Sequence, residues 1–501
     1  MEEARIDEIA DQVLGRRKLT GMGDLRIESS VIEPVVKSQN FCRFEVPRGK
    51  GILDSDTAVQ LSVKNNDTTA TGSRAYLNTL QGIKGLINKA VLRIGGKVIA
   101  TSEEFHFLSA TLAGHTPADD KECISHNIEG SQFYWRNLTQ LQESTSPAAP
   151  NLFINGSVMV GGNHFENAAG VGDQLNFLVD EHILPDSTDA STPKFMVRLH
   201  ELFPFLKSNQ LPLFTMPDQS VFVELYFNNP TTPAPVCQNV GGASAITIVE
   251  DDLKLFATYQ FFADEVMNRI QNRYDTQGLS FIYEDYQYVR KGLPASANAA
   301  DEQELVADIG GQNKVIRDIL IHKQTYVQTE IVPGYSHYRC NGLYERTSTV
   351  DVEESYQFEI NDQLLFPRPI NEPAALLYYY STAGDNGDAW IPKPVQSYEA
   401  GILGNGSLTG DATGANGCFF EGSSGGAFAG SYAPRAITFR KDRSNSAGNG
   451  KLVGSKPVRM IYRRKGAAAG DQGSDSQLSF RIWLVVERGF VLKDGEVAVS
   501  G

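Results

Sequence analysis

The stretch Ile94-Gly95-Gly96-Lys97-Val98 decides the fold, because it returns in altered form at Ile360-Asn361-Asp362-Gln363-Leu364. Each copy consists of an apolar residue, two turn-forming residues, a polar residue and an apolar residue. Gly-Gly and Asn-Asp both accept the positive φ angles of a two-residue β-hairpin turn, and alternating strand-like residues precede both copies. The copies lie about half the chain apart, so the pattern predicts one hairpin in each half of a duplicated chain.

Two further landmarks follow each hairpin in the same order. A helix-compatible segment comes first, at 103–108 and at 371–376, and a strongly alternating strand closes each half, at 221–227 and at 478–486. Long loops occupy matching places, at about 113–195 and 381–457. These features predict an all-β protein of two similar antiparallel sandwiches with short helices and long surface loops.

The duplication divides the 501 residues into four predicted parts. Residues 1–25 form an N-terminal arm, 26–230 the first sandwich, 231–250 a linker rich in turn formers, and 251–501 the second sandwich. A helical segment is expected at Asp264–Tyr274, where apolar side chains recur on one side.

The N-terminal arm is amphipathic. Ile6, Ile9, Val13 and Leu14 stand at helical spacing among charged residues. Such a helix either packs on its own domain or docks on a partner or a neighbouring subunit, and the sequence leaves both alternatives open.

Charge and cysteine usage exclude several classes of protein. The net charge of −15 opposes general nucleic-acid binding, because an acidic surface repels phosphates. The five cysteines are odd in number and far apart, which suits a reducing compartment. An acidic start without an apolar run long enough to span a bilayer predicts a protein that is not secreted.

Signatures of catalysis or cofactor binding are weak. Cys123-x-x-His126 and His337-x-x-Cys340 have spacings that a Cys2His2 zinc site would use, but such pairs arise by chance and no other metal signature supports them. Nucleophile-elbow, phosphate-loop and zincin motifs are missing from the sequence. We therefore expect no catalytic residues, no cofactor and no metal.

One segment stands out by its charge. Residues 435–465 contain ten basic residues and one acidic residue, and end in Arg463-Arg464-Lys465 shortly after Arg459. Arg459, Arg463, Arg464 and Lys465 form either a solvated or internally paired face, or a contact with acidic surface on a neighbouring subunit. Contact with a genome ranks third.

Several of these segments resemble the double-jelly-roll major capsid proteins of icosahedral DNA viruses. The hairpin at 90–99 and the segment 202–225 resemble the early hairpin and the end of the first domain in that family. In the second half, 357–362 is similar to the family's apolar-Asn-Gly hairpin, with Asn-Asp here, and 491–497 to its terminal strand. The compact size and short arm look most like the polinton-like virus and virophage branch.

The resemblance implies a double jelly roll, which is two tandem antiparallel sandwiches, and a structural role. In that family the chain forms a homotrimer, a pseudo-hexagonal capsomer that contacts neighbouring capsomers and minor capsid and penton proteins of a virion assembled inside the host cell. It implies no enzyme activity and no sequence-specific nucleic-acid binding, and it leaves contact with a membrane open.

The alternative is a two-domain jelly-roll protein that binds or cleaves glycans, because sandwiches serve both functions. A glycan site needs an aromatic platform in a concave surface, and the chain has three tryptophans, at 135, 390 and 483.

Overall fold

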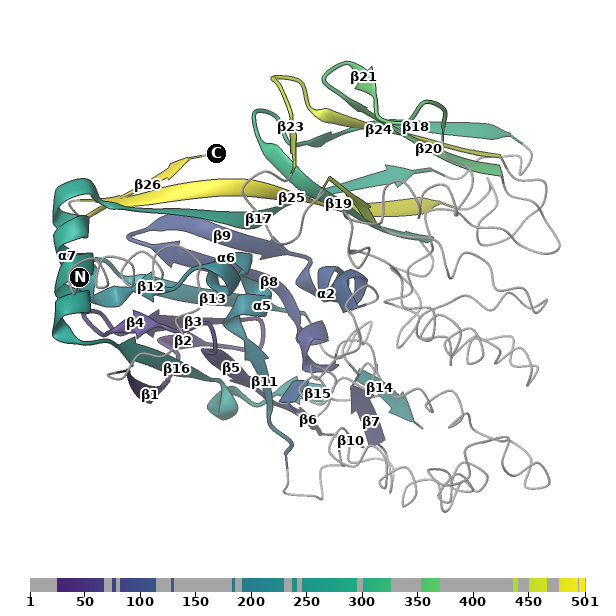
Figure 1. Cartoon of the computed structure of the whole chain (residues 1–501). Helices are drawn as coiled ribbons and strands as arrows, with labels where there is room; N and C mark the ends of the chain where they lie inside the picture. The colour runs from purple at the N-terminus through teal and green to yellow at the C-terminus, as the bar shows by residue number, and fades with distance from the viewer. Residues whose placement is uncertain are drawn as a thin grey trace, which may run out of the picture.

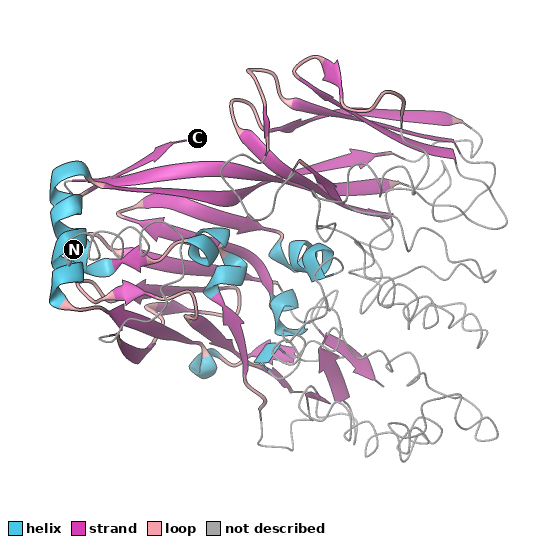
Figure 2. Cartoon of the chain, in the orientation of Figure 1, coloured by secondary structure: helices cyan, strands magenta, loops and turns pink. Residues whose placement is uncertain are grey.

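The computed structural model describes residues 25–66, 74–77, 82–113, 128–129, 183–184, 192–228, 237–240, 246–294, 301–325, 353–369, 436–439, 450–465, 477–493 and 495–500. Two antiparallel sandwiches lie side by side (Figures 1 and 2). The N-terminal arm falls outside the described residues.

The first sandwich consists of two antiparallel sheets. One has the order β11-β5-β16-β4-β12, with β1 beside β16. Its strands are β1 (Arg26–Ile32), β4 (Ile52–Leu53), β5 (Ala58–Leu61), β11 (Phe195–Arg198), β12 (Leu211–Pro212) and β16 (Lys254–Phe261). The other has the order β2-β3-β13-β8-β9. Its strands are β2 (Val36–Lys37), β3 (Phe41–Val46), β8 (Ile87–Ile94), β9 (Lys97–Glu103) and β13 (Val221–Phe227).

Smaller elements complete the first half. Two minor sheets contain β6 (Val63–Asn65), β7 (Arg74–Leu77), β10 (Ile183–Leu184), β14 (Cys237–Val240) and β15 (Ile246–Ile248). The helical segments are η1 (Gly82–Leu86), α2 (Phe105–Ala113), α5 (Leu199–Leu202), α6 (Pro204–Ser208), η5 (Leu213–Thr215), η6 (Glu250–Asp252) and α7 (Asp264–Gln277). The expected helix after residue 103 is therefore present as α2.

The second sandwich repeats the same plan. One sheet has the order β17-β25-β19-β22, with β26 beside β25 and β23 beside β19. Its strands are β17 (Leu279–Leu293), β19 (Val315–Thr325), β22 (Ala436–Thr438), β23 (Lys451–Leu452), β25 (Leu478–Lys493) and β26 (Glu496–Ser500). The other has the order β18-β24-β20-β21, formed by β18 (Glu302–Gly310), β20 (Glu353–Ile360), β21 (Gln363–Leu364) and β24 (Val458–Lys465).

The pairing orders show which strands correspond. β3-β13-β8-β9 matches β18-β24-β20-β21, and β1-β16-β5-β11 matches β17-β25-β19-β22. The prediction of two similar sandwiches is confirmed. The strand equivalence drawn from alternation is wrong, because β13 corresponds to β24, while the counterpart of β25 is β16.

The position of β16 bears on where the first sandwich ends. The sequence places this strand after the linker, but it pairs with β1, β4 and β5 of the first half. The expected linker itself contains the short strands β14 and β15. We propose that the boundary lies after α7, where Gly278 has a φ of 78° and ends the helix.

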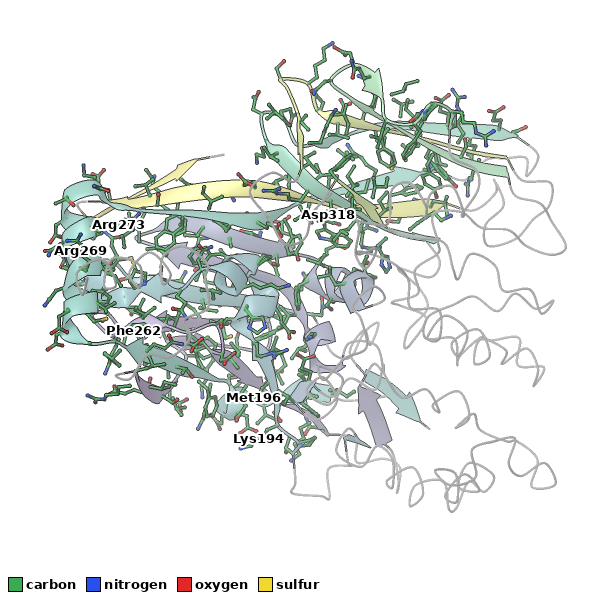
Figure 3. The ribbon with its side chains drawn as sticks, in the orientation of Figure 1. Lys194, Met196, Phe262, Arg269, Arg273 and Asp318 are labelled. Atoms are coloured by element: carbon green, nitrogen blue, oxygen red, sulfur yellow. The ribbon has the colours of Figure 1, made fainter. Side chains whose placement is uncertain are left out.

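Helix α7 confirms the predicted amphipathic segment. Val266, Ile270 and Tyr274 are buried, whereas Arg269 and Arg273 are exposed on the outer side of the helix (Figure 3). The Tyr274 hydroxyl accepts a hydrogen bond from the Gly495 backbone N–H at 2.8 Å. The helix thus connects β16 to β17 and contacts the end of the second sandwich.

Both predicted hairpins are present. Ile94 pairs with Lys97 across Gly95-Gly96, and Ile360 pairs with Gln363 across Asn361-Asp362. All four turn residues have positive φ, from 54° to 80°. Asn361 also holds its hairpin to the neighbouring loop, because its side chain accepts a hydrogen bond from the Gly454 N–H at 2.6 Å.

We expect Gly96→Ala to lower the free energy of unfolding by about 1–2 kcal/mol, because a Cβ at positive φ is strained. A Cβ at Gly96 would meet no atom within 4 Å, so backbone strain alone is measured. Gly96→Asn should cost less, because asparagine accepts this conformation, as Asn361 does. Urea unfolding of both variants checks the prediction, and equal losses would contradict it.

Candidate functional site: the junction between the two sandwiches

Strand β25 is buried on both of its faces. Phe480, Ile482 and Leu484 point into the core of the second sandwich. Trp483 and Val485, on the opposite face, join the core of the first. A strand covered on both sides is apolar almost throughout, which explains the run from Ile482 to Val486.

An aromatic cluster forms one end of this junction. Phe281 and Phe490 stack with ring centroids 4.8 Å apart. Phe205 of α6 packs edge-on against Tyr283 of β17 at 5.2 Å. Such pairs add about 0.5–1.5 kcal/mol each beyond the area that they bury.

Hydrogen bonds fix the register of the two halves. The Trp483 Nε1–H donates to the Glu103 carbonyl at 2.9 Å, and the Tyr283 hydroxyl donates to the Ile99 carbonyl at 2.5 Å. The Asn209 Nδ2–H donates to the Ile282 carbonyl at 3.2 Å. The contact is therefore specific as well as apolar.

A buried ion pair lies beside the tryptophan. Arg481, with 3% of its side chain exposed, pairs with Glu104 and lies 3.7 Å from the centroid of the Phe107 ring. Glu104 has a φ of 45°, a strained conformation for a residue other than glycine. A buried charge is costly without its partner, so Arg481 and Glu104 together favour this one arrangement of the sandwiches.

A polar cleft of ≈ 320 Å³ opens where β17 and β25 approach the outer face of β8 and β9. Among its lining groups, Arg488 donates to Asp285 at 2.6 Å and Lys89 to Glu103 at 2.6 Å. Burial and the nearby Arg488 lower the pKa of Lys314. The cleft thus lies between the two sandwiches, and its carboxylates, Asp285 and Glu103, are already paired with Arg488 and Lys89.

The basic patch predicted from the sequence lies on β24. Arg459 reaches Asp308 at 3.3 Å and Glu359 at 3.1 Å, and Arg463 reaches Glu304 at 3.2 Å. These exposed charges are thus paired across strands β18, β24 and β20. A contact of this patch with a neighbouring subunit stays a prediction.

Arg464 does not lie on that surface. Its side chain is fully buried, and its Nε–H donates to the Gln303 side chain at 2.8 Å. Alternation explains this placement, because Val458, Met460 and Tyr462 of the same strand also point inward. The side chain of Lys465 lies outside what the structure describes.

The remaining predicted site residues fall outside the described ranges. They are Ile6, Ile9, Val13 and Leu14 of the arm, and Cys123, His126, His337 and Cys340 of the hypothetical zinc site. Within the described ranges, no cluster of three or more His, Cys, Asp or Glu residues is arranged to hold a metal. No helix there is both long and apolar enough to cross a membrane.

The first sandwich contains a second buried charge cluster. The Lys84 ammonium lies 2.6 Å from a Glu129 carboxylate oxygen and also pairs with Glu201, which Arg198 contacts at 2.5 Å. Burial raises the pKa of Glu129 to about 7 against the attraction of Lys84. Burial would raise the pKa of Glu201 too, but Lys84 and Arg198 outweigh it and hold that pKa well below its usual value.

Several solved structures have an architecture similar to that of this chain. PBCV-1 VP54, whose crystal structure was fitted into a reconstruction of the virophage Sputnik, is similar over 97% of this chain and 99% of its own, with a TM-score of 0.53 and 11% identity. The cryo-EM structure of the Sputnik virophage is similar over 97% of this chain and 90% of its own, with a TM-score of 0.50 and 12% identity. The Faustovirus major capsid protein is similar over 95% of this chain and 92% of its own, with a TM-score of 0.50 and 9% identity.

The sequence itself matches no family model, and no curated protein matches it either. At these identities the structural likeness establishes the fold. The chain has the double-jelly-roll fold found in these viral capsid proteins, as its sequence predicts.

We expect Trp483→Ala to destabilise the protein by about 3–5 kcal/mol, because it empties a fully buried site between the sandwiches. Trp483→Phe keeps most of the packing and loses the bond to Glu103, so it should cost about 1–2 kcal/mol. Urea unfolding measures both. Equal losses would show that the hydrogen bond, and not the packing, holds the junction.

The raised pKa of Glu129 predicts a pH dependence. Between about pH 4.5 and 7 the folded chain holds a proton there that the unfolded chain releases, so this residue's contribution to stability falls as pH rises. Glu129→Gln should flatten the decline in melting temperature between pH 5 and 8. The exposed Glu265→Gln serves as control, and an unchanged slope in Glu129→Gln would contradict the assignment.

Proposed function

We propose that the protein is a non-enzymatic major capsid protein, which trimerises into pseudo-hexagonal capsomers that tile an icosahedral shell around a DNA genome. The proposal is supported by the double-jelly-roll fold over 97% of the chain, shared with a capsid protein. Its place is then the virion, where neighbouring capsomers and minor capsid and penton proteins are its partners.

The observation that carries the proposal is that two similar sandwiches pack against each other within the chain. The second sandwich lies alongside the first, and β17 packs along β9 (Figure 1). Each chain contributes two similar sandwiches, so three chains place six sandwiches around one axis. A threefold assembly of such chains therefore has a nearly hexagonal outline.

The alternative role in glycan binding is less well supported. The Trp483 ring is fully buried in the junction and donates its N–H within the chain. It therefore does not belong to an exposed platform, and Trp135 and Trp390 lie outside the described residues.

The arm enters the proposal as an assembly element. Its apolar residues Ile6, Ile9, Val13 and Leu14 are upstream of every strand of both sandwich cores. We propose that the arm contacts neighbouring subunits or internal partners, while the sandwiches fold without it.

Native mass tests the central claim. We expect purified protein to scatter light as three times the 54.9 kDa chain, over micromolar concentrations and a range of salt. Obligate contacts of this kind bury apolar surface that a separated chain would expose to water. A monodisperse monomer under all these conditions would refute the capsomer proposal.

A further inference from the structure

The cleft between the two sandwiches contains more cations than carboxylates. Its volume of ≈ 320 Å³ lies at the lower end of the range of small-molecule sites. Residues of β8, β9, β17 and β25 line most of it, and the turn between β18 and β19 adds one lysine. Four cationic and two acidic side chains line the cleft, which are Lys89, Arg93, Lys314 and Arg488, and Glu103 and Asp285.

Three of the four cations have a carboxylate partner within the chain. Because these partners are held at short range, the three cations and their carboxylates largely neutralise one another. The pairs are Lys89–Glu103 at 2.6 Å, Arg488–Asp285 at 2.6 Å and Arg93–Glu224 at 3.1 Å.

Lys314 is the fourth cation, and its ammonium has no such partner among the described residues. Its backbone is fixed, since its N–H donates to the Gly311 carbonyl and its own carbonyl accepts the Val453 N–H. Burial and the nearby Arg488 lower the pKa of Lys314, against the attraction of Asp285. The half-buried ammonium therefore lies in a positive local potential, which an anion would offset.

Two further donors at the cleft also lack an acceptor in the described part of the chain. The Arg488 Nε–H is buried and has no hydrogen-bond partner there. The Gln287 side-chain oxygen accepts the Gly311 N–H at 3.2 Å, and no described residue accepts from its Nε2–H groups. A buried N–H without an acceptor is costly, so these groups favour a molecule rich in acceptor oxygens.

We propose that this cleft binds a small molecule through a phosphate or carboxylate group, which pairs with the Lys314 ammonium and accepts hydrogen bonds from Arg488 and Gln287. Such charge-assisted hydrogen bonds are among the strongest that a protein makes. The proposal does not depend on the proposed capsid role. The remainder of the molecule contacts the apolar and aromatic part of the lining, which consists of Val91, Val98, Val486, Tyr226, Tyr286 and Tyr288.

A molecule in this cleft touches both sandwiches. Lys314, Arg488 and Gln287 belong to the second sandwich, whereas Lys89 and Arg93 belong to the first. A ligand that binds only the folded chain stabilises it in proportion to the logarithm of its concentration once its site is saturated. The bound molecule therefore adds to the contacts that hold the two sandwiches together.

Calorimetric titration at low ionic strength tests the site with two probes, inorganic phosphate and succinate. We expect at least one probe to bind the wild type saturably at one site per chain, and the tighter of the two identifies the group. Lys314→Gln removes the unpaired charge without breaking an ion pair, so its dissociation constant should rise about tenfold or more, as for the loss of a charge-assisted hydrogen bond. Lys314→Arg keeps the charge and should retain binding.

The matched control is Lys50→Gln, which removes one exposed lysine of the first sandwich outside the cleft. It should bind both probes as the wild type does. The proposal is overturned if neither probe binds the wild type saturably, or if Lys314→Gln binds as tightly as Lys50→Gln.

Acetylation of the wild type gives a readout that no substitution can disturb. A saturating probe should suppress modification of Lys314 and leave that of Lys50 unchanged, because only the first ammonium is covered. Peptide mass spectrometry measures both sites in one sample. Modification of Lys314 at the same rate with and without the bound probe would place the probe elsewhere and overturn the assignment.

Discussion

Burial of the outer face of β17, β25 and β19 against the first sandwich is the contact on which the rest of the structure depends. It requires β25 to be apolar on both faces, and it places Trp483 with no exposed surface between two cores. It also encloses Arg481, whose charge is tolerated because Glu104 is held beside it. The positive φ of Glu104 is a local cost that the surrounding packing offsets.

Features set by neighbouring residues could be read from the sequence. The two hairpins depend on residues that accept positive φ, and Gly95-Gly96 and Asn361-Asp362 are visible as such. Helix α7 could be predicted from the spacing of Val266, Ile270 and Tyr274, because a helix places these side chains on one face. Local patterns thus gave the class of fold and the duplication.

Features set by distant partners could not be read in the same way. Alternation shows that 254–261 and 478–486 form strands, but not which strands lie beside them. The pairing of β16 with β1, about 230 positions away in sequence, places this strand in the first sandwich, and for this reason we propose a boundary beyond α7. The same limit led to the wrong equivalence between β13 and β25, since both alternate and only their neighbours distinguish them.

Within the basic segment, a stronger signal was present in the sequence. Val458, Met460 and Tyr462 alternate with Arg459 and Arg463, and continuing that period places Arg464 on the inner face, where the structure has it. Arg481 gives a similar signal, because it is the single charge in the stretch 478–486 of this strand, and a buried charge requires a partner. Only the fold could identify that partner as Glu104, 377 positions earlier.

Charge pairing within the chain also bears on how copies associate. Each chain carries a net charge of −15, so copies repel one another at distances below the screening length of about 8 Å at physiological salt. The exposed arginines of β24 are already neutralised by Asp308, Glu359 and Glu304, and forming new pairs with a neighbour would first break these. Exchange of one exposed pair for another gains little free energy. The proposed association of copies would therefore have to draw its free energy mainly from apolar surface, and among the described residues of the first sandwich the exposed aliphatic side chains are concentrated on β1, β2 and the segments that flank them.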